Sequence, residues 1–216
     1  MSPPHRPRVL LADDHLLVAE ALKSLLTPEF ELVGVVEDGR ALVEAAARLR
    51  PDVIVADVTM PHLNGIDALI QLRQGGDQVP VVFLTMHRDV TFARRALEAG
   101  ASGFVLKHSA PAELVLAIRA ALEGRTYLTP QLAGEVLASM KQGPEGAGDP
   151  VVSLTPRQRE VLQLLAEGRS AKEIAASLSI SARTVEFHKY QLMETLGLHT
   201  NAELVHFAIK HGLVEL

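Results

Sequence analysis

The feature that most constrains the fold is an alternation of two sequence patterns between residues 8 and 124. Short apolar runs rich in β-branched residues recur at positions 9–11, 32–36, 53–55, 79–84 and 104–106. Such near-continuous runs are typical of parallel strands buried on both faces. Stretches of helical period separate them, at 16–26, 41–49, 66–72, 91–99 and 111–122. The alternation predicts an α/β domain with a five-stranded, doubly wound parallel sheet, whose ligand site lies at the carboxyl ends of the strands.

Only helical patterns remain after residue 153. Thr155 opens a first helix, Ser170 caps a short second one, Ser181 caps a third, and residues 201–211 form a fourth. Helices this short depend on packing against one another, so they predict a small all-α domain of four helices. A tight turn separates the second helix from the third. That is the helix-turn-helix arrangement, which lays the later helix in the DNA major groove.

A stretch rich in Gly and Pro, residues 142–150 (QGPEGAGDP), separates the two patterns and has no apolar side chain beyond Ala147. This composition predicts a flexible linker, and a further helix is expected before it at 129–140. The expected organisation is an N-terminal tail at 1–7, the α/β domain at 8–125, a linker of helix and flexible stretch at 126–150, and the helical domain at 151–216.

Composition excludes several classes of protein. The 216 residues include no Cys, which removes disulfide scaffolds, thiol catalysis and Cys-based metal sites and fits a reducing cytoplasm. The first eight residues hold three prolines and no apolar core, and no apolar run approaches the ~20 residues that span a bilayer. A cytoplasmic protein without membrane association is therefore expected. The net charge of -5 argues against a generally basic nucleic-acid binder, so DNA affinity must be local.

Polar residues stand where the predicted strands end. Asp13 and Asp14 follow the first strand, Asp57 the third, Thr85 the fourth and Lys107 the fifth. Parallel strands bring these positions to one edge, where three carboxylates either hold a proton or recruit a hard cation such as Mg2+. One carboxylate could then attack a phosphoryl group, with Mg2+, Lys107 and Thr85 neutralising its oxygens. The alternative, that each residue is only a helix cap or loop residue, explains a single Asp better than this set.

The third C-terminal helix has two distinct faces. At 3.6 residues per turn, Val185 and Leu192 share one face, while Phe187 and Tyr190 lie roughly opposite. An outward Phe could pack against a thymine methyl, and an outward Tyr could do so or bind a phosphate. From the helix pattern alone, an ordinary bundle whose aromatics pack on a neighbouring domain remains an alternative. The residues expected to contact DNA are Lys172, Arg183, Thr184, Phe187, Lys189 and Tyr190.

Short motifs follow the predicted strands in a fixed order: Asp13-Asp14, Asp57 with Met60-Pro61, Asn64-Gly65, Thr85, Gly100-Ala101, and Lys107 after Phe104-Val105-Leu106. Their order and spacing resemble the receiver domain of two-component response regulators, a flavodoxin-like fold, over about residues 8–124. The resemblance implies that Asp57 is the phosphoacceptor, and that Asp13, Asp14 and Asp57 hold Mg2+. It also implies that Lys107 contacts the phosphoryl group and that Thr85 moves toward it on activation. Phe104 takes the place of the family's rotating aromatic residue, where Tyr is commoner.

The C-terminal half carries LTPRQREVL at 154–162, AEG at 166–168, KEIA at 172–175, TVEFH at 184–188 and LG at 196–197. These motifs look like the LuxR-type helix-turn-helix, and the two halves together resemble the NarL/FixJ family of response regulators. One departure is that Glu194 and Thr195 stand where the family usually has basic residues. Seven Lys and Arg and seven Glu between 151 and 216 leave the domain neutral. Weak nonspecific DNA affinity is expected, with dimerisation adding two half-sites.

The prediction is a transcription regulator that acts as a switch and not as an enzyme. A sensor histidine kinase donates a phosphoryl group to Asp57, and the activated chain forms a homodimer on double-stranded DNA. One rival is a regulator that acts by protein contacts without binding DNA. The other is an Mg2+-dependent aspartyl phosphatase. Against the phosphatase, enzymes of the haloacid dehalogenase type need a second Asp two residues after the nucleophile, and here that position is Thr59.

Overall fold

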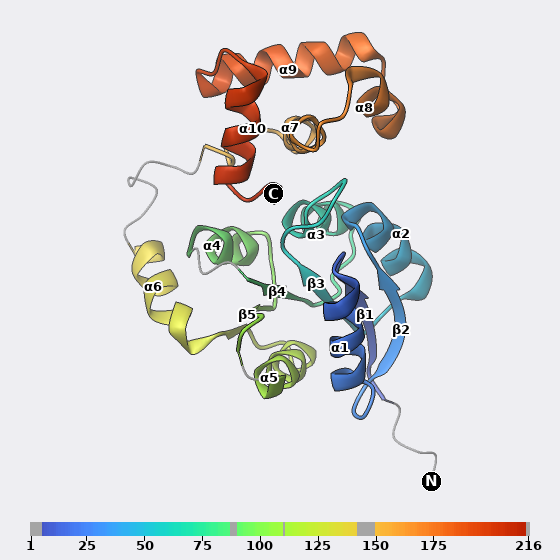
Figure 1. Ribbon diagram of the computed structural model, residues 1–216. Helices are drawn as coiled ribbons and strands as arrows, with labels where there is room; N and C mark the ends of the chain where they lie inside the picture. Colours follow the sequence, from blue (N-terminus) through green and yellow to red (C-terminus); the bar gives the residue numbers. More distant parts are fainter. Residues whose placement is uncertain (1–5, 87–89, 110, 142–149, 215–216) are drawn as a thin grey trace. The chain divides into compact units, whose positions relative to one another are not determined.

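The structure is a computed structural model that describes residues 6–86, 90–109, 111–141 and 150–214. The chain forms two compact units (Figure 1). The first unit comprises Met1–Met60 and Asn64–Gly143, and the second comprises Pro61–Leu63 and Pro144–Leu216. The predicted flexible stretch falls almost entirely on residues 142–149, and the predicted tail mostly on residues 1–5. Both of these segments lie outside the described residues.

A parallel sheet in the order β2-β1-β3-β4-β5-β6 forms the centre of the first unit. The doubly wound parallel topology predicted from the sequence is confirmed, and every strand pair is parallel. The strands are short and mostly buried, as near-continuous apolar runs predict. They are β1 (Arg8–Ala12), β2 (Glu31–Val36), β3 (Val53–Asp57), β4 (Val81–Thr85), β5 (Gly103–Leu106) and β6 (Tyr127–Leu128).

The prediction of five strands is wrong by one, because β6 adds a sixth strand beside β5. Tyr127 pairs with Gly103, and Leu128 pairs with Phe104. The next residue extends this edge, since the backbone N–H of Thr129 donates to the carbonyl oxygen of Phe104 at 3.0 Å. A strand of two residues carries no detectable alternation, so pattern reading misses it. Because β6 joins the sheet, the chain passes directly from the sheet into the helix that follows.

The described residues of the first unit form six helices: α1 (Leu16–Leu26), α2 (Gly39–Leu49), α3 (Gly65–Gln74), α4 (Val90–Glu98), α5 (Pro111–Leu122) and α6 (Pro130–Lys141). Buried residues of α1 and α5 pack with β1, β3, β4 and β5 in one apolar core. Helices α2, α3 and α4 lie on the other side of the sheet in Figure 1. The helix predicted before the linker is present as α6, which packs beside α4 and buries Leu132 and Val136.

The second unit is the predicted all-α domain of four helices: α7 (Pro156–Ala166), α8 (Ala171–Leu178), α9 (Ala182–Leu196) and α10 (Asn201–Lys210). Thr155, Ser170 and Ser181 are the N-caps of α7, α8 and α9, as predicted. Their hydroxyl groups accept backbone N–H groups that the first turn of a helix leaves without partners. These N-cap residues therefore allow the first residues of the three helices to be predicted from the sequence. No helix in the described ranges has the length and apolarity that crossing a membrane requires.

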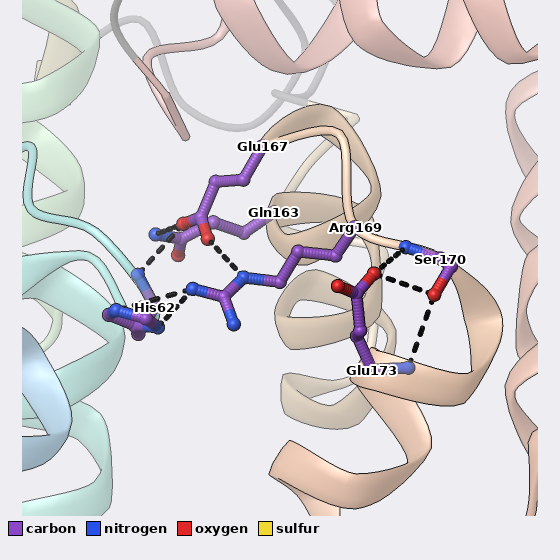
Figure 2. A network of polar contacts seen from close by, with 6 residues as sticks. All are labelled: His62, Gln163, Glu167, Arg169, Ser170 and Glu173. Atoms are coloured by element: carbon purple, nitrogen blue, oxygen red, sulfur yellow. Dashed lines mark hydrogen bonds and ion pairs between the residues drawn. The ribbon is translucent and has the colours of Figure 1, made fainter.

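Figure 2 shows how the turn into α8 is held. The Glu173 carboxylate accepts the Ser170 backbone N–H at 2.8 Å, while Ser170 Oγ accepts the Glu173 N–H at 3.4 Å, which makes a capping box. At the end of α7, Gln163 Nε2 donates to Glu167 Oε1 at 3.0 Å, and Arg169 pairs with Glu167. These contacts set the start of the helix that precedes α9 in the helix-turn-helix.

Candidate functional site

Four side chains that can ligate a metal meet at the carboxyl end of β1 and β3. One donor atom each from Asp13, Asp14, His15 and Asp57 lies within 4.8 Å of the others. Asp13 and Asp57 are buried, whereas Asp14 and His15 are exposed. The three carboxylates predicted to converge are therefore brought together. His15 was missed, although its position directly after Asp13-Asp14 was the available signal.

Lys107 reaches the same cluster from the end of β5. Its Nζ atom lies 2.5 Å from Asp57 Oδ2 and 2.9 Å from Asp13 Oδ2, and its side chain is largely buried. Burial raises the pKa of Asp57 from 3.8 to about 6, although the ammonium of Lys107 lowers it. Burial would lower the pKa of Lys107, but the carboxylates of Asp57 and Asp13 outweigh burial and raise it. The negative charge of the carboxylates therefore exceeds the single positive charge that Lys107 supplies.

The cluster has two sides, which engage different oxygen atoms. Lys107 Nζ faces the Oδ2 atoms of Asp13 and Asp57. On the other side, the backbone N–H of His15 donates to Asp13 Oδ1 at 2.9 Å, and the backbone N–H of Thr59 donates to Asp57 Oδ1 at 3.4 Å. Each buried carboxylate is therefore oriented by a charge on one oxygen and a backbone N–H on the other.

The loop after Asp57 is held tightly against it. Asn64 caps α3 by accepting the Asp67 N–H at 2.9 Å, and the Gly65 N–H donates to the Val58 carbonyl at 2.8 Å. A Cβ atom at position 65 would lie 2.1 Å from the backbone oxygen of Asp57, closer than any side chain allows. Gly65 is needed here for this close approach, and the approach fixes the backbone of Asp57.

The other residues predicted for this site, Thr85 and Phe104, lie in β4 and β5. Thr85 ends β4 and is fully buried, and its carbonyl oxygen accepts the Lys107 backbone N–H at 2.7 Å. Phe104 lies in β5 and is also fully buried. Thr59 is buried, and within the described residues its Oγ1 atom has no hydrogen-bond partner. Its side chain ends in a hydroxyl and adds no further acid to the site.

The cluster fits a hard divalent cation. Asp13 and Asp57 supply buried carboxylate oxygens, and Asp14 adds an exposed one. Three ionised carboxylates and one ammonium would carry a charge of about -2, which a divalent ion cancels. Oxygen-rich donor sets of this kind suit Mg2+ in particular. The arrangement can therefore hold a metal beside a carboxylate whose protonation is already perturbed by burial.

The exposed face of α9 is the second candidate site. Phe187 and Tyr190 are 54% and 69% exposed, while Val185 and Leu192 are fully buried, so the predicted two-faced helix is confirmed. Exposed aromatic residues of this size cost solvation free energy unless a partner covers them. Arg183 is exposed near them on α9, and so is Lys172 on α8.

Two residues predicted to contact DNA are already engaged with neighbours on α9. Thr184 Oγ1 lies 2.8 Å from the Oγ atom of the N-cap Ser181, and Lys189 Nζ lies 3.9 Å from Glu186. Both side chains are half-buried. Glu194 and Thr195, by contrast, are exposed near the end of α9. The contacts of all these residues with DNA stay predictions.

Comparisons with known proteins match both units. Residues 9–119 match the response regulator receiver domain, and residues 152–208 match the bacterial regulatory proteins of the luxR family. Transcriptional regulatory protein MctR of Rhizobium johnstonii is 37% identical over 209 residues, covering 96% of this chain and 95% of that protein. Oxygen regulatory protein NreC of Staphylococcus aureus is 34% identical over 215 residues, covering 96% and 99%.

A solved structure is similar along almost the whole chain. RcsB from Salmonella enterica serovar Typhimurium, bound to promoter rprA in the presence of the phosphomimetic BeF3-, aligns with a TM-score of 0.62. It is 28% identical, and the alignment covers 94% of this chain and 98% of RcsB. The fold and the acidic site define a protein of the receiver class. With both units matched, the chain belongs to the response regulators that join a receiver domain to a LuxR-type DNA-binding domain. It is a two-component transcription regulator, as the sequence predicted.

Proposed function

We propose that this regulator is switched when a partner histidine kinase transfers a phosphoryl group to Asp57 in a reaction that requires Mg2+. The observation that carries the proposal is the burial of Asp57 against Lys107 Nζ, 2.5 Å away, within reach of Asp13, Asp14 and His15. A carboxylate oxygen of Asp57 attacks phosphorus while the bond from phosphorus to the kinase imidazole nitrogen breaks. An acyl phosphate forms on Asp57, and the imidazole leaves.

Charge supports a requirement for a cation. Burial already disfavours the ionised form of Asp57, and a phosphoryl group brings further negative charge to the same place. Asp13, Asp14 and Asp57 would hold Mg2+, which when bound supplies the positive charge that offsets the phosphoryl oxygens. Lys107 binds a phosphoryl oxygen through its ammonium, and Thr85 would donate its hydroxyl to another.

For the second unit, we propose that the exposed face of α9 enters the major groove of double-stranded DNA. Phe187 and Tyr190 provide apolar contact with bases, and Arg183 and Lys172 bind phosphates. Because the unit carries no net positive charge, single domains bind weakly, and a homodimer adds the affinity of a second half-site. A solved structure of two RcsB dimers bound to two parallel DNAs supports this arrangement.

The first rival is an aspartyl phosphatase. We propose instead that the chain is a switch, because the residue two after Asp57 is Thr59, whose hydroxyl cannot act as the general acid that such phosphatases use. The second rival, regulation by protein contacts alone, would leave the exposed aromatics of α9 without a nucleic-acid partner. Sustained turnover of a small phosphoester would favour the first rival. Failure to retard any genomic fragment would favour the second.

The central test is phosphorylation with a small acyl phosphate donor. Wild type and Asp57→Asn are each incubated with the labelled donor, with Mg2+ or with a chelator, and the label on the protein is counted. Label is expected only on wild type with Mg2+. Equal labelling of Asp57→Asn would disprove the phosphoacceptor assignment, and undiminished labelling with chelator would disprove the need for a metal. Sequencing the DNA retained by the phosphorylated protein then tests DNA binding and identifies the operator.

A further inference from the structure

His15 is the one nitrogen donor in the carboxylate cluster of the described residues. Its Nδ1 atom lies 3.0 Å from Asp14 Oδ1 and 3.5 Å from Asp13 Oδ1. The residue precedes α1 with an extended backbone (φ -89°, ψ 96°), and its own N–H donates to Asp13 Oδ1. This local hydrogen bond turns the imidazole toward the carboxylates.

We propose that His15 supplies a nitrogen ligand to the cation site, so that the site prefers transition-metal ions such as Co2+ over Mg2+ more strongly than carboxylates alone would. The inference rests on the proposed function, which places a divalent cation among Asp13, Asp14 and Asp57. Imidazole is a ligand of first-row transition metals, whereas Mg2+ favours oxygen donors. His15 therefore helps to determine which metal ion the site prefers.

The geometry of the cluster favours His15 as a ligand. Lys107 takes the Oδ2 atoms of Asp13 and Asp57, so the Oδ1 atoms of Asp13 and Asp14 are the ones that face His15. A cation that binds these Oδ1 atoms comes within reach of Nδ1 as well.

The exposure of His15 leaves its ring free to adjust to a bound cation. The side chain is 53% exposed, so the ring can turn without disturbing the core. Asp13 on the opposite side is only 1% exposed and is fixed by its contacts. The site thus combines rigid buried oxygen donors with one movable nitrogen donor. A side chain that binds one metal ion better than another changes the selectivity of the site by that difference in binding free energy.

The test measures metal affinities directly. The electron paramagnetic resonance signal of free Mn2+ is followed as Mn2+ binds the full-length protein, and Mg2+ or Co2+ is then added as competitor. Replacing His15→Asn should weaken Co2+ binding by about tenfold or more, because outer-shell partners of a metal already carry that much affinity. The Mg2+ affinity should stay nearly unchanged. His206→Asn, which removes an exposed histidine of α10, serves as the control and should change neither affinity.

A second measurement needs no variant. In wild type with 15N-labelled histidine, substoichiometric Co2+ should shift and broaden the His15 imidazole resonances before those of the other eight histidines. A first response at any other histidine would overturn the inference. So would a His15→Asn variant that loses Mg2+ and Co2+ affinity by the same factor. If wild type binds no Mn2+ that Mg2+ displaces, the proposed Mg2+ site itself fails, an outcome distinct from loss of the His15 effect alone.

Discussion

The hydroxyl of Thr129 accepts a hydrogen bond from the backbone N–H of Leu106 at 3.2 Å, and both residues are buried. Leu106 ends β5, directly before the lysine of the acidic site, and Thr129 directly precedes α6. The same hydroxyl donates to Glu113 Oε2 at 3.2 Å. One side chain therefore connects the strand that leads to Lys107 with the helix that leads out of the first unit.

Replacing Thr129→Val should lower the free energy of unfolding of the first unit by about 1–3 kcal/mol, because the buried Leu106 N–H loses its acceptor. Valine keeps the shape of threonine, so the change isolates the hydroxyl. Thr129→Ser keeps the hydroxyl and is the matched control. Urea denaturation measures the free energy, and hydrogen exchange reports the Leu106 amide. Wild-type stability in the Val variant would mean that this amide finds another acceptor.

Asp57→Asn should stabilise the metal-free protein at neutral pH. Because burial raises the pKa of Asp57 from 3.8 to about 6, the native state holds its proton longer than the unfolded state. Native stability therefore falls as the pH rises from about 4 to about 6, a loss of about 3 kcal/mol that the Asn variant avoids. Chemical denaturation with chelator across this range measures the difference. The difference in the free energy of unfolding between variant and wild type should be small at pH 4 and should level off above pH 6.

Saturating Mg2+ provides the control for the Asp57→Asn experiment. A cation that binds only the native wild type stabilises it by mass action and should reduce the advantage of the variant. A variant advantage that is the same at every pH would contradict the raised pKa of Asp57. An advantage that Mg2+ leaves intact would count against a metal site that includes this carboxylate.

Phe187→Ala and Tyr190→Ala should each weaken binding to the operator more than binding to a random duplex. Both side chains are exposed on α9, where contact with base edges would give sequence preference, at a cost of about 1–3 kcal/mol for each lost specific contact. Titrating both duplexes at one salt concentration measures the ratio of affinities. Equal losses on the two duplexes would show that these aromatics do not contact bases.

Glu194→Arg combined with Thr195→Lys should tighten binding to operator and random DNA alike. Both residues are exposed near the end of α9, and new phosphate contacts there carry no sequence information. Each contact should steepen the slope of log affinity against log salt by roughly 0.9. The measurement is a salt series on both duplexes. An unchanged slope would place this end of α9 away from DNA.

Features set by interactions between residues close in sequence could be predicted, whereas most features set by residues far apart in sequence could not. The buried strands, the caps Ser170 and Ser181, and the exposure of Tyr190 follow from periodicity and from local hydrogen bonding, so they were predicted. The convergence of Asp13 and Asp57 followed from parallel topology. The two residues of β6 and the contact of Thr129 with Leu106 depend on backbone geometry set by distant neighbours, so they were not predicted.

The close approach at Gly65 limits how receivers of this kind can diverge. A side chain there would meet the carbonyl oxygen of Asp57 at 2.1 Å, so the loop would have to be rebuilt before any other residue was accepted. Rebuilding it would move the backbone that presents Asp57, the proposed phosphoacceptor. On the proposed function, replacement of Gly65 is therefore expected to accompany loss of phosphorylation. A descendant that has replaced this glycine should be sought among regulators that have abandoned the phosphate signal, and a protein engineer who grafts a foreign α3 must carry the glycine across with it.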